Sequence, residues 1–141
     1  MMSVQLVETP NDVLLDGKQR IGPELLALPA GKVCIAIYGF SGKQSYDAFC
    51  EKSERTLTPY PLVKGHLQNQ LEDAGDTLLL VVVDAVGPDE SHLNAATMQS
   101  VLEAREKQSS QVAVSFRLTR DEQSQAYRVE NKSSSSVSAN Q

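Results

Sequence analysis

Two segments of this 141-residue chain are apolar at every position, residues 33–38 and residues 78–83. Each segment runs into a polar turn, which begins at Gly39 after the first and at Asp84 after the second. A strand without polar alternation is covered on both faces, as central strands of parallel α/β sheets are. The two segments therefore predict a pair of buried parallel strands, and their turns should share the carboxyl edge of the sheet, where open α/β folds bind ligands.

Helical segments are expected between and after these strands. Ser41 and Gln44 have the spacing of a capping box, which predicts a helix that begins at residue 42 or 43. A second helix should follow a cap at Thr58 and end at Gly75 in a left-handed conformation. A third helix, capped by Ser91 or by Asn94, should turn five residues inward: Leu93, Thr97, Met98, Val101 and Leu102. The connections between residues 38 and 78 and between residues 83 and 112 are both expected to be right-handed parallel crossovers.

The remaining strands should form hairpins at both ends of the sheet. Residues 4–6 and 13–15 flank a turn rich in proline and Asx residues, which predicts a short N-terminal hairpin. Residues 112–118 alternate in polarity and residues 127–129 continue the alternation, which predicts an antiparallel edge hairpin. The expected class is α/β: one small domain over residues 1–130, with a mixed sheet, two central parallel buried strands and about three helices. Residues 131–141 are rich in serine and should form a disordered tail.

Composition excludes several classes of function. The net charge is −5 and the 13 Lys and Arg residues are scattered, so we expect no nucleic-acid partner. No segment has the length of a membrane span or the pattern of a signal peptide, so no membrane partner and a cytoplasmic location are expected. Cys34 and Cys50 fit as small buried apolar side chains. Zinc spacings and dinucleotide fingerprints are missing from the sequence, so neither a metal nor a cofactor is predicted.

The segment after the first apolar run resembles two known phosphate-binding or catalytic turns. Residues 38–45 resemble a P-loop, and residues 78–84 resemble the Walker B strand that ends in an aspartate. The P-loop pattern needs glycine where this chain has Ile37 and a hydroxyl residue where it has Gln44. Residues 39–41 also resemble the nucleophile elbow of α/β-hydrolases, with Asp84 and His92 in that family's chain order, but Lys43 replaces the second elbow glycine. These departures argue against nucleotide binding and against hydrolase activity.

The candidate ligand-binding residues are those that the two polar turns should bring together: Gly39, Ser41, Gly42, Lys43 and Asp84. Asp84 ends a buried strand, so its carboxylate needs a donor such as Lys43, backbone amides or an ion to stay charged. If the edge is a ligand site, Lys43 and Asp84 should approach each other across a cleft. Acidic residues 89 and 90 are explained by a helix start.

Two functions from different classes follow from these observations. The favoured one is a non-enzymatic module that binds a protein partner or its own copies through the edge hairpin of residues 112–130 or through an exposed helix face. The alternative is a small ligand-binding protein or enzyme that handles a phosphate-bearing or other anionic ligand at the carboxyl edge.

Overall fold

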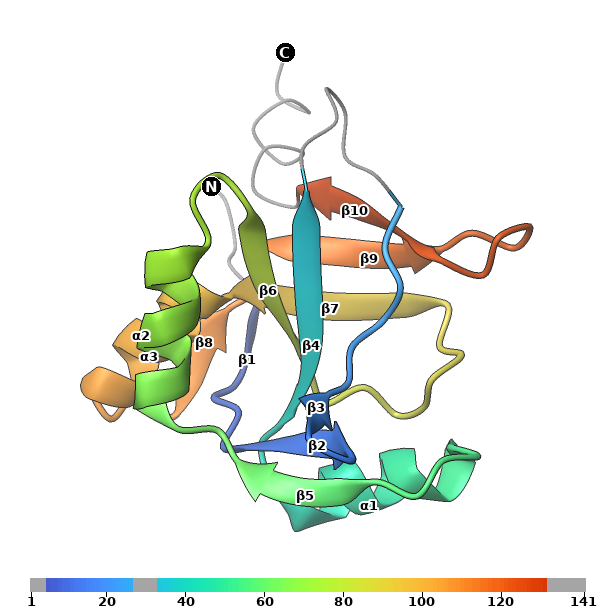
Figure 1. Cartoon of the computed structure of the whole chain (residues 1–141), viewed down its shortest axis with the longest axis horizontal. Coiled ribbons are helices and arrows are strands. Elements are labelled where there is room, and N and C mark those ends of the chain that lie inside the picture. Colours follow the sequence, from blue (N-terminus) through green and yellow to red (C-terminus); the bar gives the residue numbers. More distant parts are fainter. Residues whose placement is uncertain (1–4, 27–32, 132–141) are drawn as a thin grey trace.

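The two apolar segments form β4 (Cys34–Phe40) and β6 (Leu78–Val83), which pair in parallel at the centre of the sheet. The register runs from Cys34 opposite Leu78 to Gly39 opposite Val83. The structure is a computed structural model and describes residues 5–26 and 33–131 (Figure 1). The predicted α/β class and the parallel central pair are confirmed.

Within the described residues an eight-stranded mixed sheet has the order β10-β9-β7-β6-β4-β2-β3, with β5 paired to β2, and β1 pairs with β8 separately. The other strands are β1 (Leu6–Glu8), β2 (Asp12–Asp16), β3 (Gln19–Arg20), β5 (Thr58–Pro61), β7 (His92–Thr97), β8 (Gln111–Ala113), β9 (Phe116–Arg120) and β10 (Tyr127–Asn131). The helices are α1 (Lys43–Lys52), α2 (Lys64–Asp73) and α3 (Met98–Glu106).

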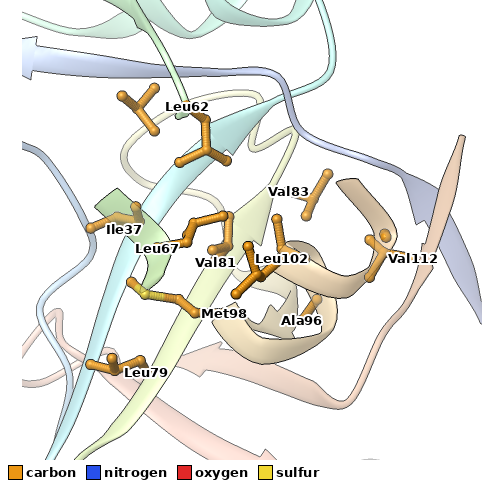
Figure 2. Packing of buried hydrophobic residues seen from close by; sticks show 13 residues of the cluster. Ile37, Leu62, Leu67, Leu79, Val81, Val83, Ala96, Met98, Leu102 and Val112 are labelled. Atoms are coloured by element: carbon orange, nitrogen blue, oxygen red, sulfur yellow. The ribbon is translucent and has the colours of Figure 1, made fainter. Parts of the chain in front are cut away.

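Both faces of the sheet are covered from Ala36 to Phe40 in β4 and from Leu79 to Val83 in β6, whereas Val33 and Ile35 at the start of the first apolar segment are exposed, contrary to the prediction. Side chains of Ile37, Val81 and Val83 pack with residues of α2, α3 and β8 in one cluster (Figure 2). Tyr38, Leu80 and Val82 belong to a second cluster, which includes Phe49 of α1 and Tyr127 of β10. Each central strand thus supplies alternate side chains to two cores, and this removes apolar surface from water on both sides of the sheet.

Several predicted boundaries are confirmed. Helix α1 begins at Lys43, and Gly75 follows α2 with φ +58°, in the left-handed region that favours glycine. Strands β9 and β10 form the expected antiparallel hairpin at one end of the eight-stranded sheet. Asn131, which the sequence placed in the tail, is the last residue of β10, and residues 132–141 lie outside the described residues.

The third helix begins later than predicted, because residues 92–97 form strand β7. This strand pairs antiparallel with β6 and with β9, so the expected second parallel crossover is wrong. Leu93 and Thr97 fit a helix period, but Leu93, Ala95 and Thr97 also fit a strand period. Pairing of this strand with β6 satisfies backbone groups of β6 that a helix at residues 92–97 would leave without partners. Helix α3 starts at Met98, and the side chain of Thr97 accepts a hydrogen bond from the amide of Ser100 at 3.0 Å.

Two further local predictions are wrong. Residues 58–61 form the exposed edge strand β5 instead of capping a helix, and α2 starts at Lys64. The N-terminal hairpin does not form, because β1 pairs with β8 while β2 pairs with β3, β4 and β5. The predicted strand over residues 112–118 divides in two: the amide of Val114 donates to Gln5 and the amide of Ser115 donates to Ala95.

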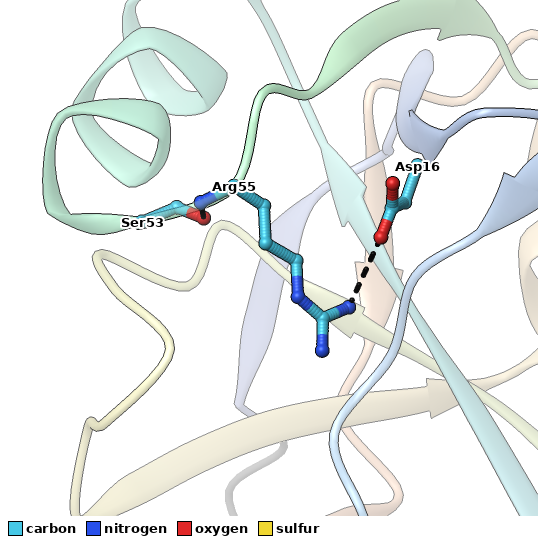
Figure 3. Close-up of polar contacts among 3 residues, drawn as sticks. All are labelled: Asp16, Ser53 and Arg55. Atoms are coloured by element: carbon cyan, nitrogen blue, oxygen red, sulfur yellow. Dashed lines mark hydrogen bonds and ion pairs between the residues drawn. The ribbon is translucent and has the colours of Figure 1, made fainter.

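The segment after α1 is tied back to the sheet by an ion pair. Arg55 Nη1 lies 3.3 Å from a carboxylate oxygen of Asp16, the last residue of β2, and the amide of Arg55 donates to Ser53 Oγ (Figure 3). Both charged side chains are largely exposed, so this pair contributes little to stability.

None of the helices in the described ranges is both long enough and apolar enough to cross a membrane.

Candidate functional site

The ends of β4 and β6 are joined by Ser41 and Asp84. The carboxylate of Asp84 accepts a hydrogen bond from the amide of Ser41 at 2.8 Å and another from Ser41 Oγ at 2.7 Å. Asp84 has φ +54°, a conformation that aspartate tolerates better than most residues. Its own amide donates to the carbonyl of Gly39 and extends the parallel ladder by one bond. Ser41 therefore supplies the hydrogen-bond donors that we expected the buried carboxylate of Asp84 to need.

This arrangement replaces the predicted capping box. The N-cap of α1 is Gly42, which has extended backbone angles, and no side chain caps that helix. The Ser41 hydroxyl donates to the carboxylate of Asp84, and its oxygen does not accept from a helix amide; hydrogen bonds to a carboxylate are stronger than those between neutral groups.

The two glycines of the turn have different roles. Gly39 lies inside β4, where an added Cβ would come within 2.6 Å of Val81 Cγ1 and 2.9 Å of Pro10 Cβ. Its small size thus permits β4 to pack closely against its neighbours. At Gly42 an added Cβ would meet nothing within 4 Å, so that position does not require glycine.

Lys43 does not approach Asp84 as the ligand-site hypothesis expected. Its Nζ lies 2.5 Å from a carboxylate oxygen of Asp47, one turn along α1, and both side chains are exposed. The hydrogen bond and charge of Asp47 raise the pKa of Lys43. The cation that the sequence assigned to the carboxyl edge is thus paired within its own helix.

A different cation reaches this edge, Arg105 in the last turn of α3. Arg105 Nη1 donates to the carbonyl of Pro10 at 3.2 Å and to Asn11 Oδ1 at 3.0 Å. Asn11 Nδ2 in turn donates to the carbonyl of Ser41 at 3.0 Å. A chain of hydrogen bonds therefore runs from Arg105 through Asn11 and Ser41 to Asp84, and connects α3 with the ends of β4 and β6.

Beside this chain lies an open cleft of about 610 Å³, which we call the polar cleft. It is bordered by Glu8, Thr9, Asn11 and Ser41 on one side and by Arg105 and residues 108–111 on the other. The buried Thr9 closes part of its wall, because its amide and hydroxyl donate to the carbonyls of residues 110 and 109. Of the predicted site residues, only Ser41 lines the polar cleft.

Arg105 was not predicted as a site residue, although its position in the helical pattern of the sequence indicates an inward side chain. Val101 and Leu102 are buried on α3, and Arg105 follows them at spacings of four and three residues, on the inward side of the helix. An arginine at an inward helical position has to find oxygen acceptors, since a buried unpaired charge is costly. The two hydrogen bonds that Arg105 makes with described residues both leave from Nη1, and its buried Nε has no partner among them.

A second open cleft, of about 720 Å³, lies between the end of α1, residues 21–24 and the turn that precedes β10. Three aromatic side chains line it, but Tyr38, Phe49 and Tyr127 are only 4%, 1% and 2% exposed. These rings belong to the core and offer almost no face on which a ligand could stack.

Among the described residues, the two thiols form no disulfide and the potential metal ligands form no metal-binding group. Cys34 and Cys50 are free and half-buried, and burial raises the pKa of the Cys34 thiol to about 11. At neutral pH that thiol is protonated and weakly nucleophilic. Across residues 5–26 and 33–131, no group of three or more His, Cys, Asp or Glu side chains is placed to hold a metal ion.

No protein-family model, curated protein or solved structure matches this chain.

Proposed function

We propose that this chain is a non-enzymatic binding domain that holds a small oxyanion in the polar cleft. The observation that carries the proposal is the arrangement of the Arg105 guanidinium in the cleft wall: two oxygen acceptors fix its Nη1, its Nε is buried, and none of the described residues accepts a hydrogen bond from its Nη2. A guanidinium group held in one orientation loses little further entropy on binding a carboxylate or phosphate. Asn11, Gln108 and Gln111 add amide groups to the lining.

Binding is favoured over catalysis by the types of residue present. No imidazole, thiol or amine is among the described side chains that line the polar cleft. The Ser41 hydroxyl donates to the carboxylate of Asp84, and no imidazole or amine among the described residues is hydrogen-bonded to it.

The test compares Arg105→Gln with Lys43→Gln, which removes a cation from the same end of the sheet but outside the cleft. Thermal unfolding and calorimetric titration are measured with inorganic phosphate at constant ionic strength. A ligand present at ten times its Kd stabilises the folded state by about 1.4 kcal/mol. We expect wild type and Lys43→Gln to bind phosphate equally and Arg105→Gln to lose binding.

General salt stabilisation acts on all three proteins alike, so the difference among them is the readout. Absence of calorimetric binding to wild type, or equal binding by Arg105→Gln, would contradict the proposal. The unfolding midpoint of each variant without phosphate identifies any loss of stability that is unrelated to binding.

Protein interaction or self-association is the second candidate. Val33 and Ile35, at the start of β4, are 58% and 49% exposed, which favours a contact at this end of the strand. The sheet edges favour it less. The amide and carbonyl of Tyr127 in β10 already pair with residues 24 and 26, and β5 carries two prolines without amide hydrogens. Light scattering over a dilution series tests self-association, and a monomer at high concentration would contradict it.

A further inference from the structure

The polar cleft differs from ordinary small-molecule sites in the chemistry of its wall. Such sites are lined mainly by apolar and aromatic side chains, with a few polar groups for orientation. In the described wall of this cleft every side chain is polar, and most are neutral amides or hydroxyls. The wall offers a nucleobase or another aromatic ring no apolar or aromatic side chain on which to stack.

Amides and hydroxyls are instead suited to a ligand rich in hydroxyl groups. Asn11, Gln108 and Gln111 can each donate and accept, as a sugar hydroxyl also does. The cleft volume of about 610 Å³ is larger than one phosphate group needs and leaves room for a further polar moiety.

The two charged residues of the wall set the charge of that ligand. Arg105 is the cation, and Glu8 is the carboxylate; it lies in β1 opposite Gln111 of β8. An ionised carboxylate accepts hydrogen bonds from hydroxyl groups and repels a second anionic group. One anionic group and several hydroxyls therefore match the wall better than a polyanion does.

We infer that the ligand of the polar cleft is a polyhydroxylated compound with a single phosphate or carboxylate, of the sugar-phosphate or sugar-acid class. This inference rests on the proposed function. Arg105 binds the anionic group, Glu8 accepts hydroxyl hydrogen bonds, and the amides of the wall complete the contacts.

Calorimetric titration of the full chain tests this inference with five probes: glucose 6-phosphate, gluconate, inorganic phosphate, glucose and AMP. We expect glucose 6-phosphate or gluconate to bind at least tenfold more tightly than inorganic phosphate. Glucose and AMP should both bind more weakly than glucose 6-phosphate and gluconate. The order of the first two compounds distinguishes a sugar phosphate from a sugar acid.

Glu8→Gln is the diagnostic variant, and Glu106→Gln is its control, because Glu106 is exposed on α3 outside the cleft. Glu8→Gln should weaken the hydroxylated ligand severalfold and leave inorganic phosphate binding unchanged, while Glu106→Gln should change neither. The inference is overturned if inorganic phosphate binds through Arg105 but the hydroxylated ligands gain nothing, if AMP binds as tightly, or if Glu8→Gln has no selective effect. Loss of all Arg105-dependent binding would instead overturn the proposed function itself.

Discussion

Ser41 donates two hydrogen bonds to Asp84, one from its amide and one from its hydroxyl, although 43 residues separate them in the chain. The pair joins the carboxyl ends of the two central strands and fixes the turn that leads into α1. It also positions the Ser41 carbonyl that accepts from Asn11, and Asn11 in turn accepts from Arg105. The shape of the polar cleft thus depends on a contact that no local pattern contains.

Asp84→Ala should destabilise the fold, because it leaves two donors of Ser41 without their acceptor. Hydrogen bonds to a charged group contribute about 1.5–3 kcal/mol, so we expect a loss near 2 kcal/mol in urea unfolding. Asp84→Asn keeps one acceptor oxygen and tolerates the positive φ, and it should lose about half as much. An Asp84→Ala protein as stable as wild type would show that the contact contributes nothing.

Gly39→Ala should also destabilise the fold, since the new Cβ would overlap Val81 and Pro10. Overpacking of this kind costs about 1–3 kcal/mol. Gly42→Ala is the matched control, because space is open there, and its unfolding free energy should stay within about 0.5 kcal/mol of wild type. Equal effects at the two glycines would contradict the close packing of β4.

Thr97→Ala should weaken α3 at its first turn. Removing a threonine N-cap costs about 1 kcal/mol, and Thr97→Ser, which keeps the hydroxyl, should cost less. Chemical denaturation of the two variants measures the difference. If the serine variant were no more stable than the alanine variant, the cap would not be formed in solution.

Stability should fall as the pH is lowered toward 5, in part because of His66 on α2. Burial, and secondarily the charge of Arg20, lower the pKa of His66 below its usual value of 6.5. The unfolded chain therefore binds a proton more readily than the folded one, and folding free energy is lost as pH falls through the unfolded pKa. His66→Gln should reduce this dependence in urea titrations at pH 7.5 and pH 5.5, and an unchanged dependence in that variant would contradict the prediction.

The architecture was predictable where one physical requirement dominated. The two apolar runs could be buried only between two layers, so the parallel pair of β4 and β6 followed from composition alone. The left-handed Gly75 followed from local backbone preferences, whereas the start of α1 was predicted at the right residue from a capping box that does not form. The β9–β10 hairpin followed from alternation over two adjacent segments.

The candidate site was predictable only in part. The sequence placed Ser41 and Asp84 at one edge, and the structure brings them into contact, but Lys43 pairs within α1 and Arg105 takes its place near the edge. Sequence spacing gives the face of a helix on which a side chain lies, but not the distant carbonyl that will accept from it.

The sequence by itself indicated which two segments supply the central strands, because apolar side chains gain free energy in proportion to the area they remove from water. Only the tertiary structure decided that residues 92–97 form a strand, that Ser41 donates hydrogen bonds to Asp84 instead of capping α1, and that Arg105 borders the polar cleft. Each of these outcomes is a competition between a local hydrogen bond and one made across the fold. Such competitions are settled by partners that are far away in the chain and become neighbours only in the folded structure.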